Sequence, residues 1–139
     1  MVVERSVVIA RPRDEVFAFV ADPVNDPQWC PKVRSVEPVT GEEGRWRVVH
    51  KPVPGKPERE LDHRRVAAEP PARLAWREDD GTDVFDVLYT LEAVGEGTRM
   101  TQRSEFTLGA PRLLHPLYKA GIGRDVARQL KLLKRRLEA

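Results

Sequence analysis

The sequence has little of three things that would narrow its function: cysteine, charge of one sign, and long apolar runs. Its single cysteine excludes an internal disulfide and fits a reducing compartment. Its 24 basic and 22 acidic residues are interspersed, and the net charge of +2 argues against a dedicated nucleic-acid binder. No apolar run approaches the roughly 20 residues of a membrane span, and residues 1–10 lack the apolar centre of a signal peptide. We therefore expect a cytoplasmic protein without a nucleic-acid partner or stable membrane insertion.

Enzyme signatures are also missing. The sequence contains no Gly-x-Ser-x-Gly, no His-Glu-x-x-His and no glycine-rich phosphate loop. Its histidines, His50, His63 and His115, are scattered without a closely spaced ligand pair, so we expect no metal and no cofactor. Cys30, between Trp29 and Pro31, is interpreted as a packed thiol rather than a nucleophile. Motif spacing alone therefore assigns no reaction.

The most regular pattern in the chain lies between residues 111 and 137, where apolar residues recur every three or four positions. This spacing predicts one long helix with an apolar stripe, and Pro111 suits its first turn. The opposite face is basic and is expected to be solvated, although attraction to anionic lipid is an alternative. The stripe comprises Leu113, Leu114, Leu117, Tyr118, Ile122, Val126, Leu130, Leu133 and Leu137.

Two glycines, Gly121 and Gly123, interrupt this predicted helix. Each costs up to ~1 kcal/mol relative to alanine in a helix interior. One interpretation is a kink or close packing on a sheet. The other is that the missing side chains leave room for a ligand beneath the helix.

The rest of the chain predicts one strand, two helices and six further strands, within a single domain of residues 1–139. After a strand at residues 2–10, a helix begins at Pro12, and a short second helix follows Pro23 and stops near Pro27. Short turns between the later strands favour antiparallel neighbours. The six later strands are expected at residues 33–39, 45–51, 58–67, 73–78, 84–93 and 98–107.

The strand at residues 58–67 does not alternate cleanly. Leu61 and Val66 are five positions apart, so strict alternation would place them on opposite faces. Either a bulge intervenes or Leu61 faces outward. The pattern therefore leaves open which of Asp62 and His63 points inward.

Segments spread over nearly the whole chain resemble one family; they are Val7–Pro12, Glu15–Val20, Asp22–Pro23, Trp29, Pro70–Leu74, Gly97–Thr101 and Leu130–Glu138. The family is the polyketide cyclase/dehydrase-like (SRPBCC) branch of the START/Bet v 1 superfamily. The resemblance implies an α+β helix-grip fold, a curved antiparallel sheet of about seven strands wrapped around the long C-terminal helix, with two short helices after the first strand. It also implies an apolar internal cavity. Members include aromatase/cyclases, lipid and steroid carriers and hormone receptors, and they share no catalytic motif.

Polar residues share predicted strand faces with apolar ones, as Gln102 and Ser104 do between Met100 and Phe106. In a dry core each would cost ~1–3 kcal/mol without a partner, whereas in a cavity a ligand can satisfy it. We expect the helix stripe to pack on the concave face of the sheet and Trp29 to be at least half buried at one end. The predicted ligand site comprises Trp46, Val48, His50, Trp76, Val87, Tyr89, Met100, Gln102, Ser104 and Tyr118.

Three functions are compatible with these patterns. The first is binding of a hydrophobic small molecule (polyketide, aromatic or lipid-like) in the cavity of a bacterial monomer or homodimer. The second is a cofactor-free cyclase or dehydratase that uses His50, Tyr89 or His63 as its acid–base group. The third is a lipid carrier that docks on membranes through the basic helix. An acid–base group in the pocket with its own supporting partner would favour the enzyme.

Overall fold

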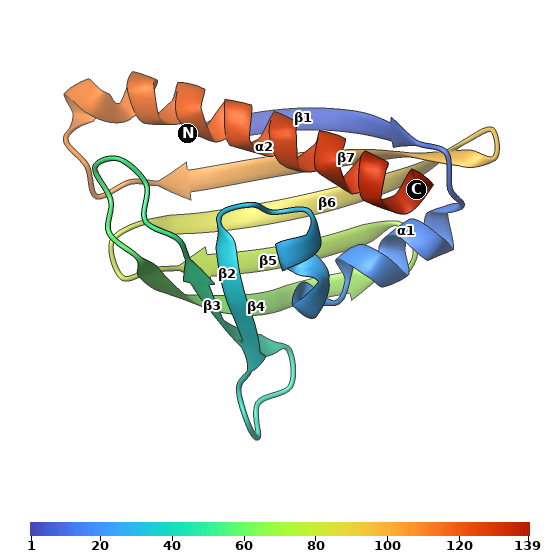
Figure 1. The fold of residues 1–139 in the computed structure, drawn as a ribbon, viewed down its shortest axis with the longest axis horizontal. Coiled ribbons are helices and arrows are strands. Elements are labelled where there is room, and N and C mark those ends of the chain that lie inside the picture. The colour runs from blue at the N-terminus through green and yellow to red at the C-terminus, as the bar shows by residue number, and fades with distance from the viewer.

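The computed structural model describes residues 1–139, and seven antiparallel strands form its single curved sheet (Figure 1). The strand order is β1–β7–β6–β5–β4–β3–β2, so every later strand pairs with the next one along the chain. This meander follows from the short turns between strands. The strands are β1 (Val2–Ile9), β2 (Val33–Pro38), β3 (Arg45–His50), β4 (Arg59–Glu69), β5 (Arg73–Asp79), β6 (Val84–Val94) and β7 (Gly97–Thr107).

Four helical segments complete the fold, in the order that the sequence predicts. Two short ones, α1 (Arg13–Val20) and η1 (Pro23–Gln28), follow β1, and a turn of η2 (Arg112–Leu114) leads into the long α2 (His115–Glu138). Figure 1 shows α2 lying across the sheet beside β1, and α1 lies near the C-terminal end of α2. No helix combines the length and the apolar character that crossing a membrane would require.

The apolar stripe of α2 packs on the sheet only along its central and C-terminal turns. Val126, Leu130 and Leu133 are buried, whereas the expectation that Leu117 packs there is wrong, because Leu117 is 67% exposed. Leu113 is also exposed. The reason is visible in Figure 1, where the N-terminal part of α2 projects past the start of β1.

Strand β4 contains the bulge that was one of the two predicted alternatives. The register with β5 shifts between Arg65 and Ala67. Leu61 and His63 are buried, whereas Val66, which lies at the bulge, is 64% exposed, so the two apolar residues stay on opposite faces, as alternation alone places them. Asp62 therefore points outward, where its carboxylate accepts from Arg45 at 2.7 Å and from Arg64 at 2.8 Å.

The end of the molecule around α1 is filled with apolar side chains. Val16 and Val20 of α1 and Ile9 of β1 are at most 1% exposed. Trp29 follows η1 and is 1% exposed, which confirms its predicted burial, and its ring centroid lies 6.1 Å from that of Tyr89. Because this end is packed, the open space between α2 and the sheet lies at the opposite end of the molecule.

Candidate ligand-binding site

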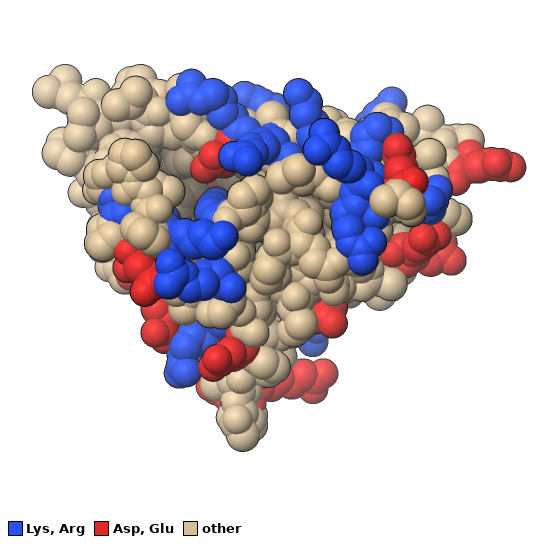
Figure 2. All heavy atoms as spheres, in the orientation of Figure 1, with Lys and Arg blue, Asp and Glu red and all other residues tan.

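Two adjoining spaces lie between α2 and the strands. The outer one is a cleft of about 510 Å³ between the N-terminal half of α2 and the loop that joins β3 to β4, and Figure 2 shows it as a hollow. The inner one is a cavity of about 40 Å³ deeper in the sheet. The two spaces are contiguous because Lys32, His50, Glu78, Phe85, Ile122 and Gln129 line both.

Strand alternation supplies most of the inner cavity's wall. Val48 and His50 from β3, Val87 and Tyr89 from β6, and Gln102 and Ser104 from β7 face it. At about 40 Å³, this cavity is far smaller than an ordinary ligand pocket. The outer cleft, in contrast, falls within the roughly 300–1,000 Å³ typical of ligand pockets.

Two buried polar atoms at the inner cavity have no hydrogen-bond partner in the protein. They are the Oε1 atom of Gln102 and the Nε2 atom of His63. The Gln102 amide makes one long contact, 3.4 Å from its Nε2 to the Ser104 hydroxyl. Because an unsatisfied buried polar group costs about 1–3 kcal/mol, these atoms are available to a molecule that enters the cavity.

The environment of the inner cavity disfavours charge. Burial, and then the positive charge of Lys32, lowers the pKa of His50 to about 4. Burial also raises the pKa of the Cys30 thiol, the Tyr89 phenol and the Asp26 carboxyl above their ordinary values. The side chains at the centre of the site therefore favour their neutral forms.

One acid–base group in this cavity has a supporting partner. The Nδ1 atom of His63 lies 3.5 Å from Glu78 Oε1, which is within ion-pair distance but long for a hydrogen bond. The imidazole lies beside two indoles, with its centroid 4.6 Å from Trp76 and 6.1 Å from Trp46. Burial lowers the pKa of His63, and the charge of Glu78 opposes this shift. His50, the other buried histidine, has no side-chain partner.

The cleft differs from the mostly apolar pocket that the sequence predicts. Only five of its 19 lining residues are hydrophobic, although apolar atoms still supply most of the lining surface. The reason is that the cleft opens to solvent at the overhanging end of α2, where charged side chains remain hydrated. The loop at residues 52–57 forms one wall, and Lys56 anchors it through a contact of 2.5 Å to Asp83.

The two glycines of α2 have different surroundings. Gly121 lines the cleft, and a Cβ atom built on it meets nothing within 4 Å. A Cβ atom on Gly123 would lie 2.7 Å from Nη2 of Arg5 on β1. Gly123 therefore fits the interpretation of close packing, and Gly121 fits the interpretation of room beneath the helix.

The structure gathers most of the ten predicted ligand-site residues around these two spaces. Tyr118 lines the cleft, whereas Trp46, Trp76 and Met100 line neither space. Trp46 and Trp76 pack against His63, and Met100 is fully buried in the core. Contact between these lining residues and a ligand remains a prediction. Those at the inner cavity are Val48, His50, Val87, Tyr89, Gln102 and Ser104.

Four polar residues at the inner cavity escaped the sequence interpretation, namely Asp26, Lys32, Glu78 and Gln129. Glu78 follows Leu74 and Trp76 at alternate positions, and Gln129 lies on the helix stripe three residues after Val126. Both patterns could have identified them. Asp26 carries no such signal, because it lies in the irregular segment of η1. Side chains of His, Cys, Asp and Glu do not gather in groups of three or more that could hold a metal ion.

A curved antiparallel sheet that holds a long C-terminal helix above an open space defines the helix-grip class of START/Bet v 1-like proteins. The family described as polyketide cyclase / dehydrase and lipid transport matches residues 1–138. The chain therefore belongs to this family, as the resemblance in its sequence indicated.

Solved structures share this fold at low sequence identity. A protein from Thermus thermophilus is 21% identical, with a TM-score of 0.81, and the match covers 99% of this chain and 97% of that one. The Zhui aromatase/cyclase from Streptomyces sp. R1128 is 19% identical, with a TM-score of 0.83 and coverage of 99% and 93%. A START superfamily protein from Mycobacterium smegmatis is 16% identical, with a TM-score of 0.79 and coverage of 99% and 97%. No curated protein matches the sequence.

Proposed function

We propose that this protein binds a small organic molecule whose apolar body lies in the cleft and whose inner end reaches the cavity. The observation that carries this proposal is the continuity of the two spaces, from a cleft of about 510 Å³ to the unpaired Gln102 and His63 atoms. A ligand of moderate size fits the cleft, and a polar group at its inner end would satisfy those atoms.

The boundary between the two spaces supports an apolar ligand body. Phe85 and Ile122 line both spaces, and Val87 and Val126 lie further in. Burying such surface against a ligand contributes about 25 cal/mol per Å². The family description and the similarity to an aromatase/cyclase favour polyketide, aromatic or lipid-like molecules as the ligand class.

Nile red, a neutral dye that brightens in apolar surroundings, tests this proposal. We expect saturable binding at one site per chain, and loss of that binding in Ile122→Phe, because the larger side chain fills the junction of the two spaces. Leu117→Phe is the matched control, since it lies on the same helix but is exposed and outside the cleft lining. Unsaturable binding, or equal loss in both variants, would contradict the proposal.

A second candidate function is a cyclase or dehydratase-type proton transfer, which the His63–Glu78 pair favours. A buried, neutral imidazole can remove a proton α to a carbonyl group, and the adjacent carboxylate then stabilises the imidazolium. Unbound proteins often hold such pairs at long distances that shorten with substrate. Both side chains line the inner cavity, so they would meet the inner end of the ligand.

Deuterium exchange into benzylacetone, an aromatic ketone, tests this second function without knowledge of the substrate. In deuterium oxide, a base removes an α proton to give the enolate, which then takes up a deuteron. The enzyme hypothesis predicts faster exchange with the protein, and loss of this effect in both His63→Gln and Glu78→Gln. His115→Gln is the control, because its imidazole lines neither space. An unchanged exchange rate would leave binding as the only function proposed.

A further inference from the structure

The basic residues of the outer cleft are more numerous than its acidic ones. Six basic side chains line it, against only Glu78 and Asp125, and Figure 2 shows basic side chains around the hollow. Two of the six are ion-paired, Lys56 with Asp83 at 2.5 Å and Arg59 with Asp80 at 3.1 Å. The other four form no ion pair; they are Lys32, Lys51, Arg124 and Arg128.

These four cations come in two pairs from separate parts of the fold. Arg124 and Arg128 are one helical turn apart on α2, so they share a face of the helix. Lys32 and Lys51 are joined at the backbone, where the N–H of Lys51 donates to the carbonyl of Lys32 at 2.7 Å. Because both pairs line one cleft, an anion between them can contact guanidinium and ammonium groups together.

The positive charge of the cleft lowers the pKa of His50, which lies where the cleft meets the inner cavity. After burial, the charge of Lys32 is the largest cause of the lowered pKa of His50, and Arg59 acts in the same direction. Four unpaired cations around one concave space repel each other, and an anion relieves that repulsion. A solvated helix face would not require this convergence. Arg124 and Arg128 are exposed, as are Lys131 and Arg135 on the same helix, but only Arg124 and Arg128 line the cleft.

We infer that the ligand is an amphiphilic anion, with a terminal carboxylate or phosphate held among Lys32, Lys51, Arg124 and Arg128. Its apolar body then runs along Phe85 and Ile122 towards the inner cavity. Guanidinium groups suit this role because they bind carboxylate and phosphate oxygens with two parallel hydrogen bonds. This inference rests on the proposed function and adds the chemical class of the ligand to it.

Calorimetric titration with three probes of equal chain length tests the inference: decanoate, decyl phosphate and decanol. We expect at least one of the two anions to bind about tenfold more tightly than decanol, since a charge-assisted hydrogen bond contributes more than a neutral one. The anion that shows the preference identifies the head group. Raising the salt concentration should weaken this preference.

Two double variants in the cleft locate the anion, and a third outside it is the control. Arg124→Gln with Arg128→Gln should lower anion affinity to that of decanol and leave decanol binding unchanged. Lys131→Gln with Arg135→Gln removes the same charge from the same helix outside the cleft and should change neither. Lys32→Gln with Lys51→Gln tests the opposite wall of the cleft. It keeps the inference testable if the arginine variant misfolds, a defect that circular dichroism would detect.

The outcomes separate this inference from the proposed function. If decanol binds at the cleft as tightly as both anions, the inference is overturned while the proposed function stands. A preference that survives in both cleft variants, or that is lost equally in the Lys131 and Arg135 variant, also overturns it. If none of the three probes binds, the proposed function is wrong and the inference falls with it.

Discussion

The two ends of this molecule use the same sheet in different ways. At the end near α1, the space between the layers is filled, and Leu130 and Leu133 of α2 are at most 1% exposed. At the other end, α2 overhangs the sheet, Leu117 is exposed, and the cleft opens beneath the helix. The comparison indicates that the filled end supplies most of the stability. Residues that line the cleft at the other end can be substituted at little cost to the fold.

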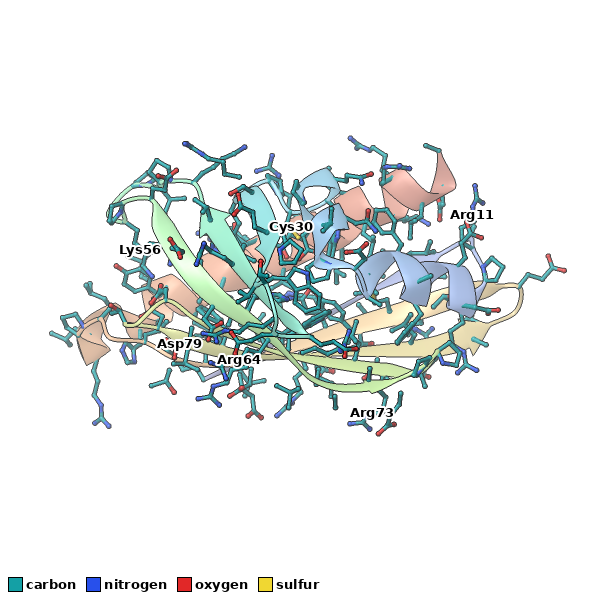
Figure 3. The ribbon with its side chains drawn as sticks, turned by 90° about the horizontal axis from the view of Figure 1, so that it is seen from below. Arg11, Cys30, Lys56, Arg64, Arg73 and Asp79 are labelled. Carbon is teal, nitrogen blue, oxygen red and sulfur yellow. The ribbon has the colours of Figure 1, made fainter.

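The two ends also treat polar groups differently. At the filled end the buried Thr98 hydroxyl donates to the carbonyl of Arg11 at 2.8 Å, so its hydrogen bond is made within the protein. At the hollow end Gln102 Oε1 and His63 Nε2 are unpaired. On the outer face of the sheet, by contrast, charged residues stay in water, and Figure 3 shows Arg73 pointing away from the helices. Trp29 Nε1, at the filled end, is also unpaired, so an unpaired atom points to a ligand only where it lines a space, as Gln102 and His63 do.

The largest expected effect contrasts two leucines of α2. Leu130→Ala should lower the free energy of unfolding by about 2–5 kcal/mol, because it leaves a cavity in the filled end. Leu117→Ala should change it by less than about 0.5 kcal/mol, since that side chain is exposed. Urea denaturation measures both. Similar losses in the two variants would remove the distinction between the ends.

The next effect is a pH dependence at the hollow end. The pKa of His50 is about 4 in the folded protein, against an ordinary value of 6.5 that applies to the unfolded chain. Between these two pH values, the unfolded chain binds a proton that the folded protein does not. Stability linked to His50 is therefore lost as the pH falls through this window, by about 2 kcal/mol between pH 7.5 and pH 5. His50→Gln should remove this part of the acid sensitivity in urea melts. Parallel pH profiles of the two proteins would contradict it.

Gln102→Leu sharpens the interpretation of the unpaired atoms. The substitution removes a buried carbonyl without a partner, so stability should stay equal or rise by about 1 kcal/mol. Ligand affinity should change at the same time, measured with the probe that binds the unmodified protein. A clear loss of stability with unchanged affinity would show that Gln102 is a structural residue.

The smallest expected effect separates the two glycines of α2. Gly121→Ala should raise stability by about 0.5–1 kcal/mol, because the new methyl group meets nothing and alanine favours helix. Gly123→Ala should gain less, because its Cβ atom approaches the Arg5 guanidinium and the side chain must move. Thermal melts of both variants measure the difference. A larger gain in stability for Gly123→Ala than for Gly121→Ala would contradict this description of the two sites.

The fold could be predicted from the sequence because it depends on local periodicity. Alternation in β6 and β7 placed Tyr89, Gln102 and Ser104 inward, and they are buried. The helix stripe identified Leu130 and Leu133 correctly. Periodicity defines a face but not what lies beneath it, which is why the exposure of Leu117 was missed.

The site could be predicted only in part, because its character depends on contacts between distant segments. Lys32 and Arg124 are far apart in the chain, so no local pattern indicates that they line one cleft. The volume of the inner cavity likewise depends on tertiary packing, as where Trp46 and Trp76 enclose His63. Alternation provided the list of inward residues but not the space left between them.

The most direct test of the central claim is chemical-shift mapping of isotope-labelled protein by NMR, with naphthol as a small, mostly apolar probe. The account predicts shift changes that cluster at His50, Gln102 and Ile122, around the junction of cleft and cavity. Val8 and Val94, exposed at the filled end, should remain unchanged. The absence of shift changes at saturating probe, or changes confined to the outer face of the sheet near Arg73, would contradict the account.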